Sequence, residues 1–189
     1  ALAVGTYLNI FTRNCDWVRM ANLAQMVNAI APIVTTPETA VTQTIWYPIL
    51  LHAQAALNTA VDVYTDGSTI DLPAGSDPGR WPHRVSDLGP FPMVDAAATV
   101  SPDRGRIALT LVNRNPDQAE TAEIVVRDLA FDGPVELHTV TAAPGTASAV
   151  PGVQAARVDE GSEATKGGTV TITLPPRSFT TVEAALARE

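Results

Sequence analysis

The sequence predicts an α+β chain in two parts: the last β/α units of a (β/α)8 TIM barrel over residues 1–59, and an antiparallel jelly-roll β-sandwich over residues 60–189. Three observations predict this division. Helical segments alternate with a short apolar segment that is typical of a buried strand in the first part, which is the order of elements in a β/α barrel. An alternating pattern typical of strands begins at Ala60. Short segments of this kind then follow one another with turn residues between them, which indicates a two-sheet antiparallel sandwich.

The first part is expected to begin with two helical stretches. Residues 1–11 read as the tail of a helix, and because they include neither an initiator methionine nor a basic leader, a truncated chain is expected. Residues 16–27 place Trp17, Met20 and other apolar side chains on one stripe, with polar side chains opposite. This pattern predicts an amphipathic helix with Asp16 as its N-cap.

A strand and another helix are predicted next. Residues 29–34 are apolar on both faces, as in a buried strand, although Pro32 cannot donate a hydrogen bond to a ladder. Residues 44–57 form an apolar helical pattern. Pro48 must then lie in the first turn of that helix or kink it.

The second part is predicted to consist of short strands after a long excursion. Residues 66–92 contain too many glycines and prolines for regular structure, and loops of that length are uncommon unless they serve a function or cover something. Trp81 either pins this loop to the sandwich or stacks on a sugar. Strands are predicted at 94–100, 106–113, 120–127, 135–140, 153–158, 169–174 and 179–184.

Composition excludes several classes of function. The formal net charge of −8 and the sequence pI near 4.7 argue against a nucleic-acid or anionic-membrane partner. No run of about 18 apolar residues is present to span a membrane. Cys15 is the single cysteine, so it cannot form an internal disulfide, and a structural thiol is expected. The three histidines lack metal-ligand spacing, and no glycine loop of the phosphate-binding kind occurs, so neither metal nor cofactor is predicted.

Two regions of the chain carry a family pattern. Met20-Ala-Asn-Leu-Ala-Gln-Met-Val-Asn with Ile30-Ala-Pro-Ile, followed by Gln43-Thr-Ile-Trp-Tyr-Pro, resembles the closing segment of the catalytic barrel in family 51 α-L-arabinofuranosidases. Three later segments resemble, in the same order, strands of the family's C-terminal β-sandwich: Leu109-Thr-Leu-Val-Asn-Arg, Glu136-Leu-His-Thr-Val and Leu174-Pro-Pro-Arg-Ser-Phe-Thr. The resemblance covers nearly the whole chain.

The resemblance implies the C-terminal portion of a retaining α-L-arabinofuranosidase, which hydrolyses terminal non-reducing α-L-arabinofuranosyl residues of arabinoxylan or arabinan oligosaccharides. Retaining glycosidases use two carboxyl groups about 5 to 5.5 Å apart, and in this family both are glutamates on earlier barrel strands. Asp16 and Glu38 match neither motif. Both catalytic glutamates are therefore expected upstream, and the chain alone is expected to be inactive and poorly soluble. A cytoplasmic enzyme, often a hexamer, is what the resemblance implies for the whole protein.

Gln43 and Trp46 are the substrate-binding residues that the resemblance implies. In the family, the glutamine at this position donates to or accepts from a hydroxyl of the arabinofuranose next to the scissile bond. An amide suits that task because it offers a donor and an acceptor together. Trp46, where the family often has Tyr or Phe, either lies at the pocket rim or packs within its helix.

A non-catalytic carbohydrate-binding or interaction β-sandwich is the alternative class. Such a module needs an aromatic platform on the sandwich. Of the three tryptophans, only Trp81 follows the two helical regions. The sequence therefore favours the enzyme interpretation over the module.

Overall fold

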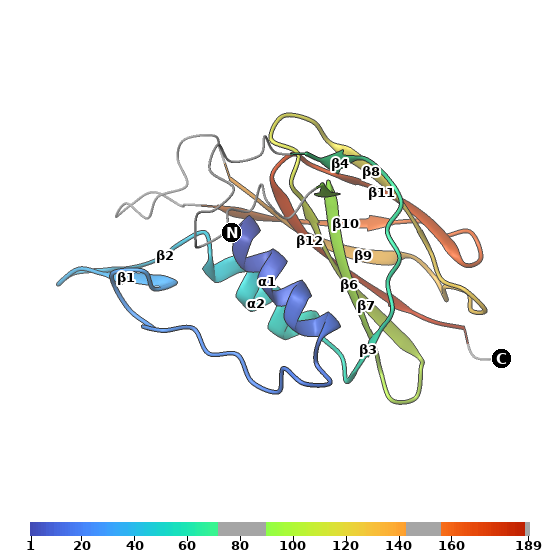
Figure 1. The fold of residues 1–189 in the computed structure, drawn as a ribbon, viewed down its shortest axis with the longest axis horizontal. Helices are drawn as coiled ribbons and strands as arrows, with labels where there is room; N and C mark the ends of the chain where they lie inside the picture. The colour runs from blue at the N-terminus through green and yellow to red at the C-terminus, as the bar shows by residue number, and fades with distance from the viewer. Residues whose placement is uncertain (72–89, 143–155, 188–189) are drawn as a thin grey trace, which may run out of the picture.

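The computed structural model describes residues 1–71, 90–142 and 156–187, and in these residues it is mostly β-sheet with two helices. Three layers are stacked (Figure 1). Helices α1 (Leu2–Arg13) and α2 (Trp46–Ala55) lie on one face of a six-stranded sheet. A two-stranded sheet covers the other face, which makes the β-sandwich. In the described ranges, no helix is long and apolar enough to cross a membrane.

The six-stranded sheet is antiparallel throughout and has the order β10-β9-β12-β7-β6-β3. The covering sheet pairs β8 with β11, and two short ribbons, β1-β2 and β4-β5, stand apart from both sheets. The strands of the larger sheet are β3 (Thr59–Val61), β6 (Val94–Val100), β7 (Arg106–Asn113), β9 (Val135–Thr141), β10 (Arg157–Glu163) and β12 (Ser178–Ala185). The others are β1 (Ile33–Thr35), β2 (Ala40–Thr42), β4 (Thr69–Ile70), β5 (Phe91–Pro92), β8 (Glu120–Val125) and β11 (Thr169–Leu174).

The central strands β7 and β12 are buried on both faces. Val182 pairs with Leu109, and both side chains belong to the core between the two sheets, whereas the neighbouring pair Thr181 and Thr110 points toward the helices. Strands covered on both faces favour apolar residues along their whole length, as β7 has from Ile107 to Val112 apart from Thr110, whereas β12 places three threonine or serine side chains among its buried positions. The inter-sheet core includes Leu109, Leu111, Ile124, Phe131, Val135, Val170, Ile172, Leu174 and Val182.

The helical layer approaches the sheet closely at Gly5. A Cβ atom at this position would lie 2.6 Å from Cδ2 of Phe179 and 3.2 Å from Cγ2 of Val112, so only glycine fits between α1 and the sheet. Val112 and Phe179 are fully buried and pack with Leu51 of α2 in a second, smaller core. Both helices therefore share a core with the strands.

The predicted strands and the outer two helices are confirmed. β6, β7 and β11 have the predicted bounds, and β8, β9 and β12 differ from theirs by one or two residues at an end. The strand predicted at 153–158 is correct in type but not in extent, because β10 (Arg157–Glu163) continues five residues beyond the predicted end. Helix α1 continues to Arg13 and α2 occupies Trp46–Ala55, with buried Pro48 in its first turn. Trp81 and residues 153–155 of one predicted strand lie outside the described residues.

The predicted helix at 16–27 is wrong. The structure has turns and irregular backbone there, and Gln25 takes a left-handed conformation with φ 59°. Trp17 and Met20, on the predicted apolar stripe, are 72% and 78% exposed. A short helix depends on burying its apolar face, and no neighbour among the described residues covers this one. Asp16 consequently caps no helix.

The predicted buried strand at 29–34 is also corrected. β1 begins only at Ile33 and pairs with β2 in a two-stranded ribbon. Ile30, expected in the strand, is 68% exposed. Both Asn28 and Ala29 have positive φ values, and this turn delays the extended backbone until after Pro32. Cys15, expected to be a structural thiol, is exposed.

Candidate functional site

Gln43 lies where the β1-β2 ribbon passes into helix α2. Its backbone N–H donates to the carbonyl of Pro32 at 2.8 Å, and its side-chain Nε2 donates to the carbonyl of Ala31 at 2.7 Å. Both acceptor residues are buried, while Gln43 itself is half-buried. Two consecutive carbonyls therefore hold both ends of the residue.

The Gln43 amide retains hydrogen-bonding capacity. An amide has two N–H donors and a carbonyl oxygen, and one donor is used by Ala31. Within the described part of the chain, Oε1 of Gln43 has no hydrogen-bond partner. The side chain can thus accept from one hydroxyl and donate to another without breaking its bond to the backbone.

Trp46 and Tyr47 open helix α2 three residues after Gln43. The Trp46 backbone N–H donates to the Gln43 carbonyl at 3.0 Å, so the glutamine closes the turn that starts the helix. Trp46 is half-buried. Thr42 donates to the Tyr47 hydroxyl at 3.3 Å, and Tyr47 packs against the smaller core. Gln43 is thereby tied to the sheet through α2.

The two acids of the first part do not form a catalytic pair. Asp16 is exposed in the irregular segment, and Glu38 is exposed in the turn between β1 and β2, where it accepts from the Thr36 hydroxyl at 3.2 Å. They belong to separate turns of the chain. Among the described residues there is also no group of three or more His, Cys, Asp or Glu side chains that could hold a metal ion.

A partly buried ion cluster joins helix α1 to the sheet. Oδ1 of Asp95 on β6 lies 3.1 Å from Arg13 and 3.3 Å from Arg114, and its Oδ2 accepts from Asn9 at 2.8 Å. Asn9 is fully buried and also bonds to Thr110 on β7. Burial lowers the pKa of the Arg114 guanidinium, and Asp95 partly offsets that shift.

Sequence reasoning did not single out this cluster, although one signal was present. Asp95 begins an otherwise apolar run, Asp-Ala-Ala-Ala, in a predicted strand. A carboxylate is rarely buried unless it is paired, so its partners had to come from elsewhere in the chain. The cluster has every charge paired or hydrogen-bonded, which fits a role in holding α1 and not in binding a ligand.

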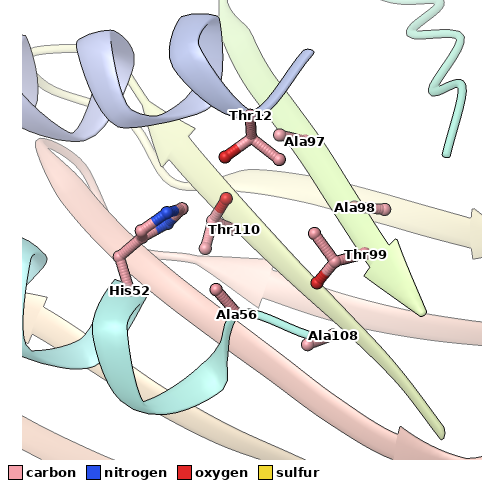
Figure 2. Close-up of a pocket in the computed structure, with 8 residues that line it drawn as sticks. All are labelled: Thr12, His52, Ala56, Ala97, Ala98, Thr99, Ala108 and Thr110. Atoms are coloured by element: carbon pink, nitrogen blue, oxygen red, sulfur yellow. The ribbon is translucent and has the colours of Figure 1, made fainter. Parts of the chain in front are cut away.

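A small space lies beneath the helices around His52 (Figure 2). Its free volume is about that of one water molecule, so a sugar does not fit. His52 points from α2 toward Thr12 and Thr110, and its Nδ1 has no hydrogen-bond partner among the described residues. Burial lowers the pKa of the His52 imidazole. The space is a packing feature of the helix–sheet interface.

Comparisons with known proteins point to one family. Residues 1–178 match the family model described as the α-L-arabinofuranosidase C-terminal domain. Probable α-L-arabinofuranosidase C of Aspergillus terreus is 30% identical over 180 residues, which are 95% of this chain and 33% of that protein. Intracellular exo-α-(1→5)-L-arabinofuranosidase 1 of Bacillus subtilis is 38% identical over 128 residues, 67% of this chain and 23% of that protein.

Solved structures show the same fold. A family 51 α-L-arabinofuranosidase from Bifidobacterium longum matches with a TM-score of 0.75 and 26% identity, over 98% of this chain and 34% of that one. The family 51 enzyme from Thermotoga petrophila matches with a TM-score of 0.78 and 20% identity, over 96% of this chain and 38% of that one. The chain spans between 23% and 38% of the length of these relatives and structures.

Proposed function

The chain belongs to the C-terminal region of family 51 α-L-arabinofuranosidases, and from this premise we propose that the whole protein removes terminal non-reducing α-L-arabinofuranosyl residues from arabinoxylan or arabinan oligosaccharides with retention of configuration. The observation that carries the proposal is the match over residues 1–178. The catalytic acid/base and nucleophile then belong to a part of the protein outside this chain, since neither Asp16 nor Glu38 has a second carboxylate as partner in the described residues.

Gln43 is proposed to bind the arabinofuranose. Its half-buried position, its anchored Nε2 and its open Oε1 support this role, because a fixed amide can orient a sugar hydroxyl at little entropic cost. Trp46, half-buried and next to it in the turn, is proposed to line the rim of the same site. No cofactor or metal takes part in this proposal.

We also propose that residues 1–59 complete a (β/α)8 barrel and that residues 60–189 form a jelly-roll sandwich. Support comes from the segment between α1 and β1, where Trp17, Met20, Met26 and Ile30 are each more than two-thirds exposed. Exposed apolar groups of this size mark surfaces that another part of a protein covers. Helices α1 and α2 would then have the sandwich sheet on one side and the barrel on the other.

The location and assembly of the whole protein are proposals of the same kind. A cytoplasmic enzyme is consistent with the relative from Bacillus subtilis, which is named intracellular. A homo-oligomer, hexameric as family resemblance implies, is testable by sedimentation velocity on the full-length protein.

The test is hydrolysis of p-nitrophenyl α-L-arabinofuranoside by the full-length protein, by this chain alone and by full-length Gln43→Ala. Activity is expected in the first, none in the second, and a loss of at least about tenfold in kcat/KM in the third, as for a lost hydrogen bond to substrate. Glu38→Ala, on the same ribbon, is the matched control and should retain full activity. An inactive but folded full-length protein, together with arabino-oligosaccharide binding by this chain, would support the non-catalytic module instead.

A further inference from the structure

The turn that precedes Gln43's two carbonyl partners is closed by one residue, Asn28, through its side chain and its backbone. Its Oδ1 accepts from the Thr35 backbone N–H at 2.8 Å, and its Nδ2 donates to the Thr35 hydroxyl at 3.0 Å. Its backbone N–H donates to the Ile33 carbonyl at 2.7 Å, and its carbonyl accepts from the Ala31 N–H at 2.9 Å. One residue thus bonds to three positions of the loop that ends in β1.

The backbone conformation explains why asparagine suits this position. Asn28 has φ 65°, in the left-handed region. Apart from glycine, asparagine is among the residues that tolerate this region best. Unlike glycine, it also carries a donor and an acceptor, and here both are used by Thr35.

The Asn28 contacts enclose the two carbonyls that hold Gln43. Ala31 and Pro32 lie inside the loop that Asn28 closes, and their carbonyls accept from Nε2 and from the backbone N–H of Gln43. If the closure is lost, the loop can rotate these carbonyls away from Gln43. The amide would then keep its chemistry and lose its fixed orientation.

We propose that Asn28 is a positioning residue for the Gln43 amide: by closing the 28–35 loop it aims the Ala31 carbonyl at Nε2 and leaves Oε1 free for a sugar hydroxyl. This inference rests on the proposed function, since it gives Asn28 a role in the sugar site only through Gln43. Misplacement of a substrate-orienting group by about 1 Å can cost up to about a hundredfold in rate.

The experiment is a double-mutant cycle in the full-length enzyme, with kcat and KM measured on p-nitrophenyl α-L-arabinofuranoside. Asn28→Gly keeps the left-handed backbone and removes the side chain, so we expect kcat/KM to fall by about tenfold or more. Asn28→Asp keeps the acceptor for the Thr35 N–H and should retain most of the activity. In the Gln43→Ala background, Asn28→Gly should cause no further loss, because two residues that act through one contact are not additive. Glu38→Ala again serves as the control on the same ribbon.

The outcomes separate this inference from the proposed function. Full activity of Gln43→Ala would overturn the role of Gln43 and with it this inference. A loss in Gln43→Ala with none in Asn28→Gly would overturn this inference alone. An Asn28→Gly loss that is undiminished in the Gln43→Ala background would also overturn it, because Asn28 would then act independently of Gln43. Thermal unfolding of each variant, unchanged within about 2 °C, distinguishes misplacement from unfolding.

Discussion

Asn9 on helix α1 and Asp95 on strand β6, 86 residues apart in the sequence, are joined by a buried hydrogen bond of 2.8 Å from Nδ2 to Oδ2. Arg13 and Arg114 approach the other carboxylate oxygen. This arrangement fixes α1 on the sheet through a paired charge, in addition to apolar contact. We propose above that α1 belongs to the barrel. The hydrogen bond between Asn9 and Asp95 would then join the barrel to the sandwich.

Removing the charge of Asp95 should destabilise the protein strongly. Asp95→Asn keeps the shape of the side chain and leaves two arginines beside each other without their counter-charge. We expect a loss of about 3 kcal/mol in the free energy of unfolding, measured by urea denaturation of the full-length protein. Asp159→Asn breaks the exposed pair of Arg157 and Asp159 and should cost less than about 0.5 kcal/mol. Equal losses in the two variants would contradict a structural role for the cluster.

Substitution of Gly5 should be costly even though alanine favours helices. The new methyl group would meet the ring of Phe179 at 2.6 Å, and overpacking of this kind costs about 1 to 3 kcal/mol. Gly161→Ala is the matched control, because its methyl group would have only ordinary contact with Leu137 at 3.8 Å. Thermal unfolding should show a lower midpoint for Gly5→Ala and an unchanged midpoint for Gly161→Ala. Adding Phe179→Leu to Gly5→Ala should recover part of the lost midpoint, because the smaller side chain makes room for the new methyl group. A midpoint for Gly5→Ala at or above that of the parent would show that α1 can shift outward freely.

Asn113 is predicted to be a stability determinant at the end of β7. It is fully buried, and its Nδ2 lies within hydrogen-bond distance of the carbonyls of Gln118, Leu174 and Pro175, while Oδ1 accepts from the Asn115 N–H. Asn113→Ala leaves these groups unpaired, so we expect a loss of at least about 2 kcal/mol by chemical denaturation. Replacing exposed Asn58 by alanine should change stability by less than about 0.5 kcal/mol.

His52 should make stability depend on pH. Burial lowers its pKa below the ordinary 6.5, so the fold favours the neutral imidazole. Stability is therefore fully present above about pH 6.5 and is lost as pH falls from there through the lowered pKa, because the unfolded chain binds the proton more readily. In His52→Gln, which cannot titrate, the free energy of unfolding should fall less steeply between about pH 7 and pH 5. Parallel curves for the two proteins would count against this assignment.

The exposed apolar segment before β1 should cause the isolated chain to self-associate. Met20 and Met26 are 78% and 71% exposed, so replacing both by lysine should reduce light scattering by the isolated chain. In the full-length protein the same change should lower stability if the barrel covers this surface. Tyr64→Lys, at an 84% exposed position outside the segment, is the control and should change neither property. Unchanged stability of the full-length double variant would argue against the proposed barrel contact.

The strands were predictable from the sequence because alternation and turn residues act locally. β7 and β12 have apolar or threonine side chains at nearly every position, as expected for strands covered on both faces, and the turns between strands carry their own glycine and proline signals. The Gln43 motif was likewise visible in sequence, since residues 43 to 48 are contiguous. The hydrogen bonds of Gln43 to the carbonyls of Ala31 and Pro32 could not be predicted from the sequence.

The tertiary structure alone decided whether an apolar pattern becomes a helix and which polar residues meet. The stripe from Trp17 to Val27 has helical spacing, yet it is irregular here because nothing in the described residues covers it, and burial supplies most of a short helix's stability. Asn9, Asp95 and Arg114 carry no shared local signal, and only the stacking of α1 on β6 and β7 brings them together. Periodicity is a property of neighbours along the chain, whereas burial and charge pairing are properties of neighbours in space.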